Sequence, residues 1–237
     1  MKNRVIIALI FGLFGSISSA WAEIPEGFVI AEGTLSPDGK FGVIAPDWDH
    51  GEEQNSNAIV EVTTGRVVHT IQAETGYQKM NHGGLYASWS KDGQQLLWTV
   101  DGKWFPRALI LIDLGKNGKV EQTDLLAACQ DEMLKRSKAK FPAEYKATKE
   151  AGGVGTAYPD GFTIGFNYQR EEALKFPLKI ELDLTNDPKL LAGANDEFTQ
   201  RLLEGGMTAK VSRSGKIRFS GFVILGPAEA LKTRDPE

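Results

Sequence analysis

The residues best suited to do chemistry lie together in one short segment, PDWDHGEEQN, at positions 46–55. Asp47 and Asp49 alternate along it, and Glu52 follows. Two alternating carboxylates could reach one hard cation, with Glu52 or backbone carbonyls completing the oxygen shell that Ca²⁺ requires. The spacing differs from that of an EF-hand loop, and a solvated acidic loop between strands is the competing interpretation. Asp47, Asp49 and Glu52 are therefore candidate ligands of a Ca²⁺ ion, and no other cofactor is expected.

Two histidines stand beside glycines in loop-like sequence, His50 in the same acidic segment and His82 in KMNHGG. They would approach each other if the repeats that contain them are neighbours. The competing interpretation is that the glycines form turns and the histidines are incidental polar residues. A zinc site through Asp49 and His50 is disfavoured, because adjacent side chains of an extended segment point apart.

Two tryptophans, Trp48 and Trp104, also lie in polar loop sequence, DWDH and DGKWFPR. Aromatic rings beside polar residues can stack on a sugar or peptide, although packing beneath the loop is the alternative. The candidate ligand-binding residues are therefore Trp48, His50, His82 and Trp104. No catalytic residue is assigned, because the sequence has no G-x-S-x-G, H-E-x-x-H, C-x-x-C or phosphate-loop motif.

A recurring turn predicts the elements that position these residues. LSPDGK at 35–40 lies between two runs rich in β-branched and aromatic residues, as do SKDGQ at 90–94, PDG at 159–161 and SRSGK at 212–216. Such sequences place glycine where a left-handed conformation is needed and predict antiparallel hairpins. Gly39 and Gly93 are 54 residues apart, as are Gly161 and Gly215. This spacing predicts repeated units with an insertion in the middle.

The first two units each continue into a second strand pair, through TTG at 63–65 and GKNG at 115–118, and so have four strands. In the third unit LKFPLKIELDL reads as the third strand, and the sequence after it reads as a helix where a fourth strand belongs. The hairpin TAKVS-RSG-KIRFSGF reads as the start of an incomplete fourth unit. Between units two and three, Asp124 predicts the cap of a helical insertion over about 124–152 that Pro142 interrupts.

SPDGKFGVI and ASWSKDGQQLLWTV, each followed by a further strand pair, resemble the blade repeats of TolB-like β-propellers. The same short pattern marks the propellers of prolyl-oligopeptidase-type enzymes. The resemblance is clear over about residues 28–123 and weaker beyond. It implies a mainly β fold of antiparallel, four-stranded, propeller-like blades with helical insertions, and it implies no particular site.

The first 22 residues have the layout of a secretory signal peptide, with Lys2 and Arg4 before an apolar run and an A-x-A site at Ala20–Ala22. Residues 23–237 are then expected to form a single β domain, periplasmic or secreted, without stable membrane insertion after cleavage. Removing the signal changes the net charge from −4 to −6, because it contains two cations and no acid. An acidic exported chain predicts no nucleic-acid partner. Cys129, the one cysteine, reads as a small buried hydrophobe.

These patterns favour an exported, non-catalytic binding or scaffold protein of the cell envelope, with an envelope protein or peptide as partner. Its contact surface would be the loops 47–55, 78–84 and 101–107. The alternative is a metal-assisted or carboxylate-dependent hydrolase centred on Asp47, Asp49, His50 and His82. A third hypothesis is a structural fragment that assembles with another chain through an exposed sheet edge, so an oligomer is left open.

Overall fold

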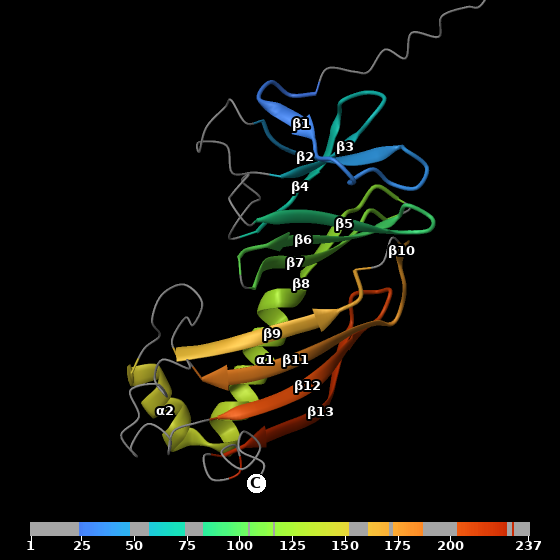
Figure 1. The fold of residues 1–237 in the computed structure, drawn as a ribbon. Coiled ribbons are helices and arrows are strands. Elements are labelled where there is room, and N and C mark those ends of the chain that lie inside the picture. Colours follow the sequence, from blue (N-terminus) through green and yellow to red (C-terminus); the bar gives the residue numbers. More distant parts are fainter. Residues whose placement is uncertain are drawn as a thin grey trace, which may run out of the picture.

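The computed structural model describes residues 24–47, 57–73, 83–103, 105–115, 117–151, 161–170, 173–186, 203–226 and 229. These residues form three sheets, here called A, B and C, and two helices (Figure 1). The chain is mainly β and its long strands pair antiparallel, as the sequence predicts.

Sheet A has four strands in the order β1-β2-β3-β4. They are β1 (Phe28–Ile30), β2 (Phe41–Pro46), β3 (Ala58–Glu61) and β4 (Val67–Thr70). The predicted hairpins over LSPDGK and TTG are confirmed by the pairs Ile30 with Ile44 and Ala58 with Thr70. His69 of β4 lies opposite Ile59 of β3. Its Nε2 is 3.1 Å from Gln122 Oε1, so it links the outer edge of sheet A to that of sheet B.

Sheet B has the order β10-β5-β6-β7-β8. Its strands are β5 (Gly84–Ser90), β6 (Gln95–Asp101), β7 (Pro106–Asp113), β8 (Glu121–Asp124) and the two-residue β10 (Ala173–Leu174). The first four form the predicted antiparallel unit, and β10 adds to β5 in parallel. Trp89 and Trp98, on paired strands, are buried.

Sheet C has four strands in the order β13-β12-β11-β9. They are β9 (Phe162–Tyr168), β11 (Leu178–Asn186), β12 (Glu204–Val211) and β13 (Ile217–Leu225). The predicted hairpin over SRSGK is correct, but its assignment to a fourth unit is wrong. β12 and β13 complete the third sheet, because β12 pairs with β11 from Leu178 with Val211 to Thr185 with Glu204. LKIELDL is accordingly the second strand of this sheet, and the segments 155–158 and 187–202 lie outside the described residues.

Two helices separate sheets B and C in the sequence, α1 (Leu125–Lys140) and α2 (Pro142–Ala151). Asp124 caps α1 as predicted, since its carboxylate accepts a hydrogen bond of 2.9 Å from the Ala127 N–H. Pro142 starts α2, a position where proline needs no amide hydrogen. The buried face of α1 contains Leu125, Cys129 and Met133, so Cys129 is the buried hydrophobe that the sequence predicts.

Three of the recurring turns are built alike. Ser36 Oγ donates to Asp38 Oδ1 at 2.6 Å and accepts from the Phe41 N–H at 2.9 Å, and Ser90, Asp92 and Gln95 repeat these bonds at 2.7 and 2.9 Å. In the third turn Ser212 accepts from the Lys216 N–H at 3.1 Å. The turn glycines adopt the predicted positive φ, for example 68° at Gly39.

The three turns also lie side by side in space. A Cβ built on Gly93 would be 3.5 Å from Asp38 Oδ1, and Arg213 forms an ion pair with Asp92. The Ser90 hydrogen bond, more than Arg213, lowers the pKa of Asp92 to about 2. The sequence repeat therefore becomes a row of turns along one side of the molecule.

The sheets meet in two different ways. Sheets A and B pack face to face through an apolar cluster that includes Val43, Ile59, Trp89 and Trp98. Sheet C instead presents its edge strand β9 to sheet B, and α1 lies behind sheet C (Figure 1). α1 contacts both β7 and β12 and joins the two sheets in one core. The opposite face of sheet C, here called the front face, contains the alternate residues Lys179, Glu181 and Asp183 and is left outside that core.

Candidate functional site

Most of the residues predicted from the sequence lie outside the described part of the chain. Trp48, Asp49, His50, Glu52, His82 and Trp104 all belong to this group. Asp47 is described, and its N–H donates to the Gly27 carbonyl at 2.9 Å. Among the described residues, no three His, Cys, Asp or Glu side chains are grouped so that they could hold a metal ion. The Ca²⁺ site and the hydrolase alternative stay predictions.

The strand ends that border the three predicted contact loops lie at one end of sheets A and B. Gly84 at the start of β5 is paired with Asp101 at the end of β6, and Asp101 with Pro106 at the start of β7. In sheet A, Pro46 lies at the end of β2 that is opposite the LSPDGK turn. The LSPDGK turn of sheet A and the SKDGQ turn of sheet B are neighbours. The strand ends that border the three loops therefore lie together at the opposite end of these two sheets (Figure 1).

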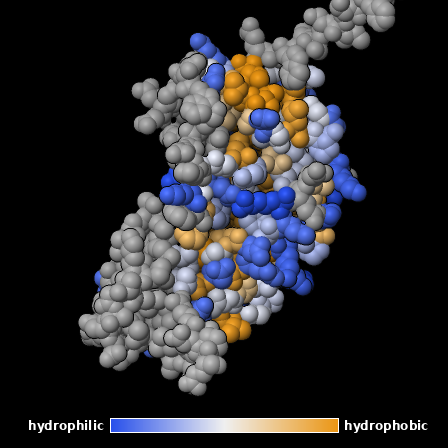
Figure 2. All heavy atoms as spheres, viewed as in Figure 1, coloured by the Kyte–Doolittle hydropathy of each residue, from blue (hydrophilic) through white to orange (hydrophobic). Residues whose placement is uncertain are grey.

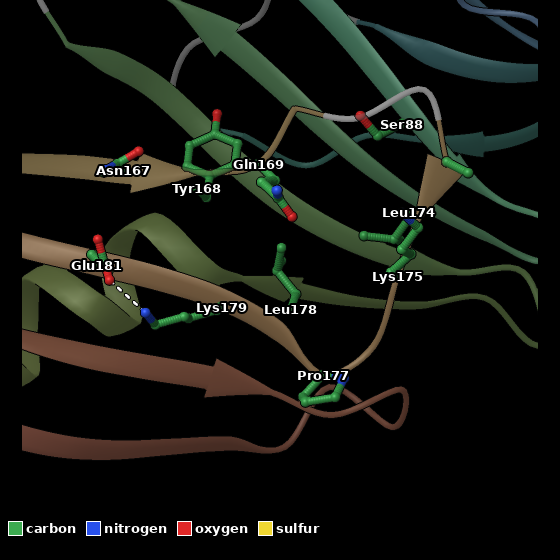
Figure 3. A pocket seen from close by; sticks show the side chains of 11 residues that line it. Ser88, Asn167, Tyr168, Gln169, Leu174, Lys175, Pro177, Leu178, Lys179 and Glu181 are labelled. Atoms are coloured by element: carbon green, nitrogen blue, oxygen red, sulfur yellow. Dashed lines mark hydrogen bonds and ion pairs between the residues drawn. The ribbon is translucent and has the colours of Figure 1, made fainter.

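Three adjoining cavities follow the front face of sheet C below sheet B, and together they are called the B–C groove. The first, of about 380 Å³, lies between Ser88 of β5, the end of β9, and the segment from β10 to β11. Figure 3 shows Ser88 and Leu174 at one side of it and the ion pair between Lys179 and Glu181 at the other. This cavity offers both apolar and polar walls, as ligand sites usually do.

The second cavity, also about 380 Å³, lies where the β6–β7 connection meets the front face of sheet C. Its wall contains Arg170, whose guanidinium forms two hydrogen bonds to Asp101 of 2.5 and 3.3 Å. The same guanidinium lies 5.2 Å from the ring centroid of Tyr86 and 5.3 Å from that of Tyr168. Desolvation lowers the pKa of Arg170, but Tyr168 and Asp101 outweigh it and raise the pKa above its ordinary value. Arg170 is thus a fixed link between sheets B and C.

Tyr168 makes a second link between these sheets, because its hydroxyl is 3.3 Å from Thr99 Oγ1 of β6. Burial of the Tyr168 ring raises the pKa of its hydroxyl. A neutral phenol and a paired arginine are positioning groups here, and neither is placed to act as a nucleophile.

Asp183 is shared by the second cavity and the third, a cavity of about 360 Å³ on sheet C alone. Its neighbours across the sheet are Gly165 of β9 and Gly206 of β12. A Cβ built on Gly165 would lie 2.5 Å from both carboxylate oxygens of Asp183, so the carboxylate occupies the space above that glycine. Although Asp183 remains exposed, desolvation by the surrounding walls raises the pKa of its carboxyl.

The sequence contains one signal for this site, which is a hydrophobic pattern and not a catalytic or binding motif. In β11 the apolar residues Ile180, Leu182 and Leu184 alternate with charged ones, which indicates a strand with one solvated face. Figure 2 shows the consequence: hydrophilic residues gather over the junction of sheets B and C, whereas hydrophobic residues lie over sheet A. The pairing of Arg170 with Asp101, 69 residues away, had no local signal.

Comparisons with known proteins add little to this geometry. No family model matches the chain, and no curated protein matches it. Among solved structures, the chain is similar to that of TolB from Acinetobacter baumannii, with 13% sequence identity and a TM-score of 0.24. The match covers 81% of this chain and 31% of the TolB chain, so this chain spans under a third of that structure. The resemblance is weak and partial.

Among the helices that the structure describes, none is long and apolar enough to cross a membrane.

Proposed function

We propose that the protein is an exported, non-catalytic binding protein of the cell envelope, built from propeller-like blades, that holds a partner in the B–C groove. The observation that carries this proposal is the row of three cavities along a polar sheet face. Cavities of this size suit ligand side chains or small ligands, and a row of them suits an extended one.

The charged groups of the groove favour recognition over catalysis. Arg170 is held by Asp101, so its guanidinium offers a fixed hydrogen-bonding position, and Lys179 pairs with Glu181 at the exposed side of the groove. The described wall residues include no histidine or cysteine, the side chains that most often act as general bases or nucleophiles. Export is inferred from the signal-like residues 1–22.

Site-specific photo-cross-linking tests this proposal. A photoreactive residue replaces Gln169, an exposed residue of the first cavity, and in a matched control it replaces Lys146 on the exposed face of α2. The mature protein is irradiated in its own envelope fraction and its adducts are identified by mass spectrometry. We expect one discrete adduct from position 169 and none from 146. The same products from both positions, or none from either, would contradict the groove as a binding site.

A further inference from the structure

Among the described charged residues of the B–C groove, Asp183 differs from the others in its lack of an ion-pair partner. Asp101 is paired with Arg170, and Glu181 with Lys179. Lys103, Lys175 and Glu204, which also border the groove, have interactions of their own. Within the described part of the chain, no cationic side chain pairs with Asp183. As far as the described residues define it, the groove therefore has a negative position without a cationic partner at the boundary of its second and third cavities.

The surroundings of Asp183 leave room for a ligand to reach it. Its two cross-strand neighbours are glycines, so no side chain covers the carboxylate from β9 or β12. Gly165 cannot be replaced without moving the carboxylate, since even a methyl group would overlap both oxygens. A long, thin cationic side chain can lie over the backbone of Gly206, which no side chain approaches among the described residues, and end at Asp183.

We propose that Asp183 receives the lysine or arginine side chain of an extended peptide segment of the partner, with the remainder of that segment lying along the groove. This inference rests on the proposed binding function. The first and second cavities share Asn167, whose exposed amide can bond to peptide groups, and the second and third share Asp183. An extended chain places successive same-side residues two positions apart, as a row of cavities requires.

The chemistry of Asp183 agrees with this role. Its partly desolvated carboxylate has a raised pKa, and such a group gains more from an incoming cation than a fully hydrated one does. The other charges that border it are Asp101 and Lys103 from sheet B, Arg170 after β9, Glu204 from β12 and Glu181 on its own strand. Binding should therefore weaken as the pH falls and Asp183 is protonated.

The test uses the mature chain, residues 23–237, and three end-capped octapeptides of glycine and serine that differ at one central residue: lysine, norleucine or glutamate. Affinities are measured by fluorescence anisotropy at low ionic strength. We expect the lysine peptide to bind at least about tenfold more tightly than the norleucine peptide, as a charge-assisted bond would give. Asp183→Asn should reduce this ratio to within about twofold. The matched control Asp131→Asn, on the exposed face of α1, should retain it.

Equal binding of the lysine and norleucine peptides, or a lysine preference that survives in Asp183→Asn, would overturn the inference. If peptides bind without charge preference and compete with the adduct at position 169, the binding function stands and the role of Asp183 is wrong. Failure of all three peptides, together with no adduct, would reject both. Circular dichroism of the variants shows whether each remains folded.

Discussion

The junction of sheets A and B differs from the junction of sheets B and C. Sheets A and B meet face to face, and β6 of sheet B is buried over Gln95–Val100, with Trp98 in the core shared with sheet A and Leu97 in the core shared with α1 and sheet C. Sheet C meets sheet B by its edge, and the contacts there include the Arg170–Asp101 and Arg213–Asp92 ion pairs, the Tyr168 hydroxyl and the apolar core shared with α1. Face-to-face packing leaves no open surface, whereas edge-on packing frees a whole sheet face for the charged residues that line the groove.

The largest effect is expected from breaking the helix that joins sheets B and C. Met133 is buried in the core shared by α1 and both sheets. Met133→Ala should lower the free energy of unfolding by about 2–5 kcal/mol, the usual cost of such a cavity. Lys135→Ala, on the exposed side of α1, should change it by less than about 0.5 kcal/mol. Urea denaturation measures both.

Cys129 provides an independent readout of the same helix. Burial, with a smaller effect of Asp124, raises the pKa of its thiol to about 12, so the native protein should react very slowly with a thiol reagent at pH 8. Met133→Ala should accelerate that reaction and Lys135→Ala should not. Rapid labelling of the native wild type would show that α1 does not hold the junction closed.

The next largest effect is expected from two tryptophans that differ in their hydrogen bonding in the core between sheets A and B. Trp89 Nε1 donates a hydrogen bond of 2.9 Å to the Thr34 carbonyl, whereas the equally buried Trp98 Nε1 has no partner among the described residues. Trp89→Phe leaves a buried carbonyl unpaired, and Trp98→Phe removes an unpaired donor. Trp89→Phe should therefore cost about 1–3 kcal/mol more than Trp98→Phe. If thermal unfolding shows that both variants lose the same free energy of unfolding, the Trp89 hydrogen bond contributes nothing to stability.

A smaller effect is expected at the polar link between sheets B and C. Arg170→Ala removes the Asp101 pair and the stacking on Tyr86 and Tyr168, at a cost of about 1 kcal/mol. Arg170→Lys keeps the charge and loses the planar stacking, so it should retain only part of the stability that Arg170→Ala removes. High salt should weaken the ion-pair contribution and leave the stacking largely unchanged. If the stability loss of Arg170→Ala disappears completely in high salt, stacking on Tyr86 and Tyr168 contributes nothing to stability.

The smallest expected effect is a gain in stability, from substitution of Asp183. Because desolvation raises the pKa of Asp183 on folding, the folded state loses stability as the pH rises from the ordinary pKa of an aspartate through the raised one. Asp183→Asn should therefore stabilise the protein at pH 7, by no more than about 0.5 kcal/mol for an exposed group. The difference should vanish near pH 3, where both states of the wild type are protonated. Urea unfolding at the two pH values checks the sign, and a destabilised variant at pH 7 would contradict it.

How much the sequence predicted depends on the range of the interactions. The hairpins around Gly39, Gly93 and Gly215 were predictable because a serine, a glycine and the adjacent strands set each turn locally. The fourth unit was wrong because strand order is set by distant pairing, here of Leu178 with Val211. The alternation in β11 indicated a solvated face, but not which sheet would lie above it.

The candidate site was also hard to predict because interactions between distant parts of the sequence bring its residues together. Asp183 and Gly165 belong to different strands, and the edge-on approach of β9 that brings Asp101 to Arg170 depends on how α1 packs. Asp47, Trp48 and His50 lie within four consecutive positions, so a prediction from local sequence finds them. The residues of the groove are adjacent only after folding.

The absence of a connecting loop between β8 and α1 has a mechanical consequence. Asp124 is both the last residue of β8 and the cap of α1, so no loop residues separate the outer strand of sheet B from the helix. At the other end of α1, Lys140 Nζ donates a 2.8 Å hydrogen bond to the Ile224 carbonyl of β13. A pulling force applied at the rim of sheet B would therefore pass along the helix to the last strand of sheet C, and the two sheets would bear tension together.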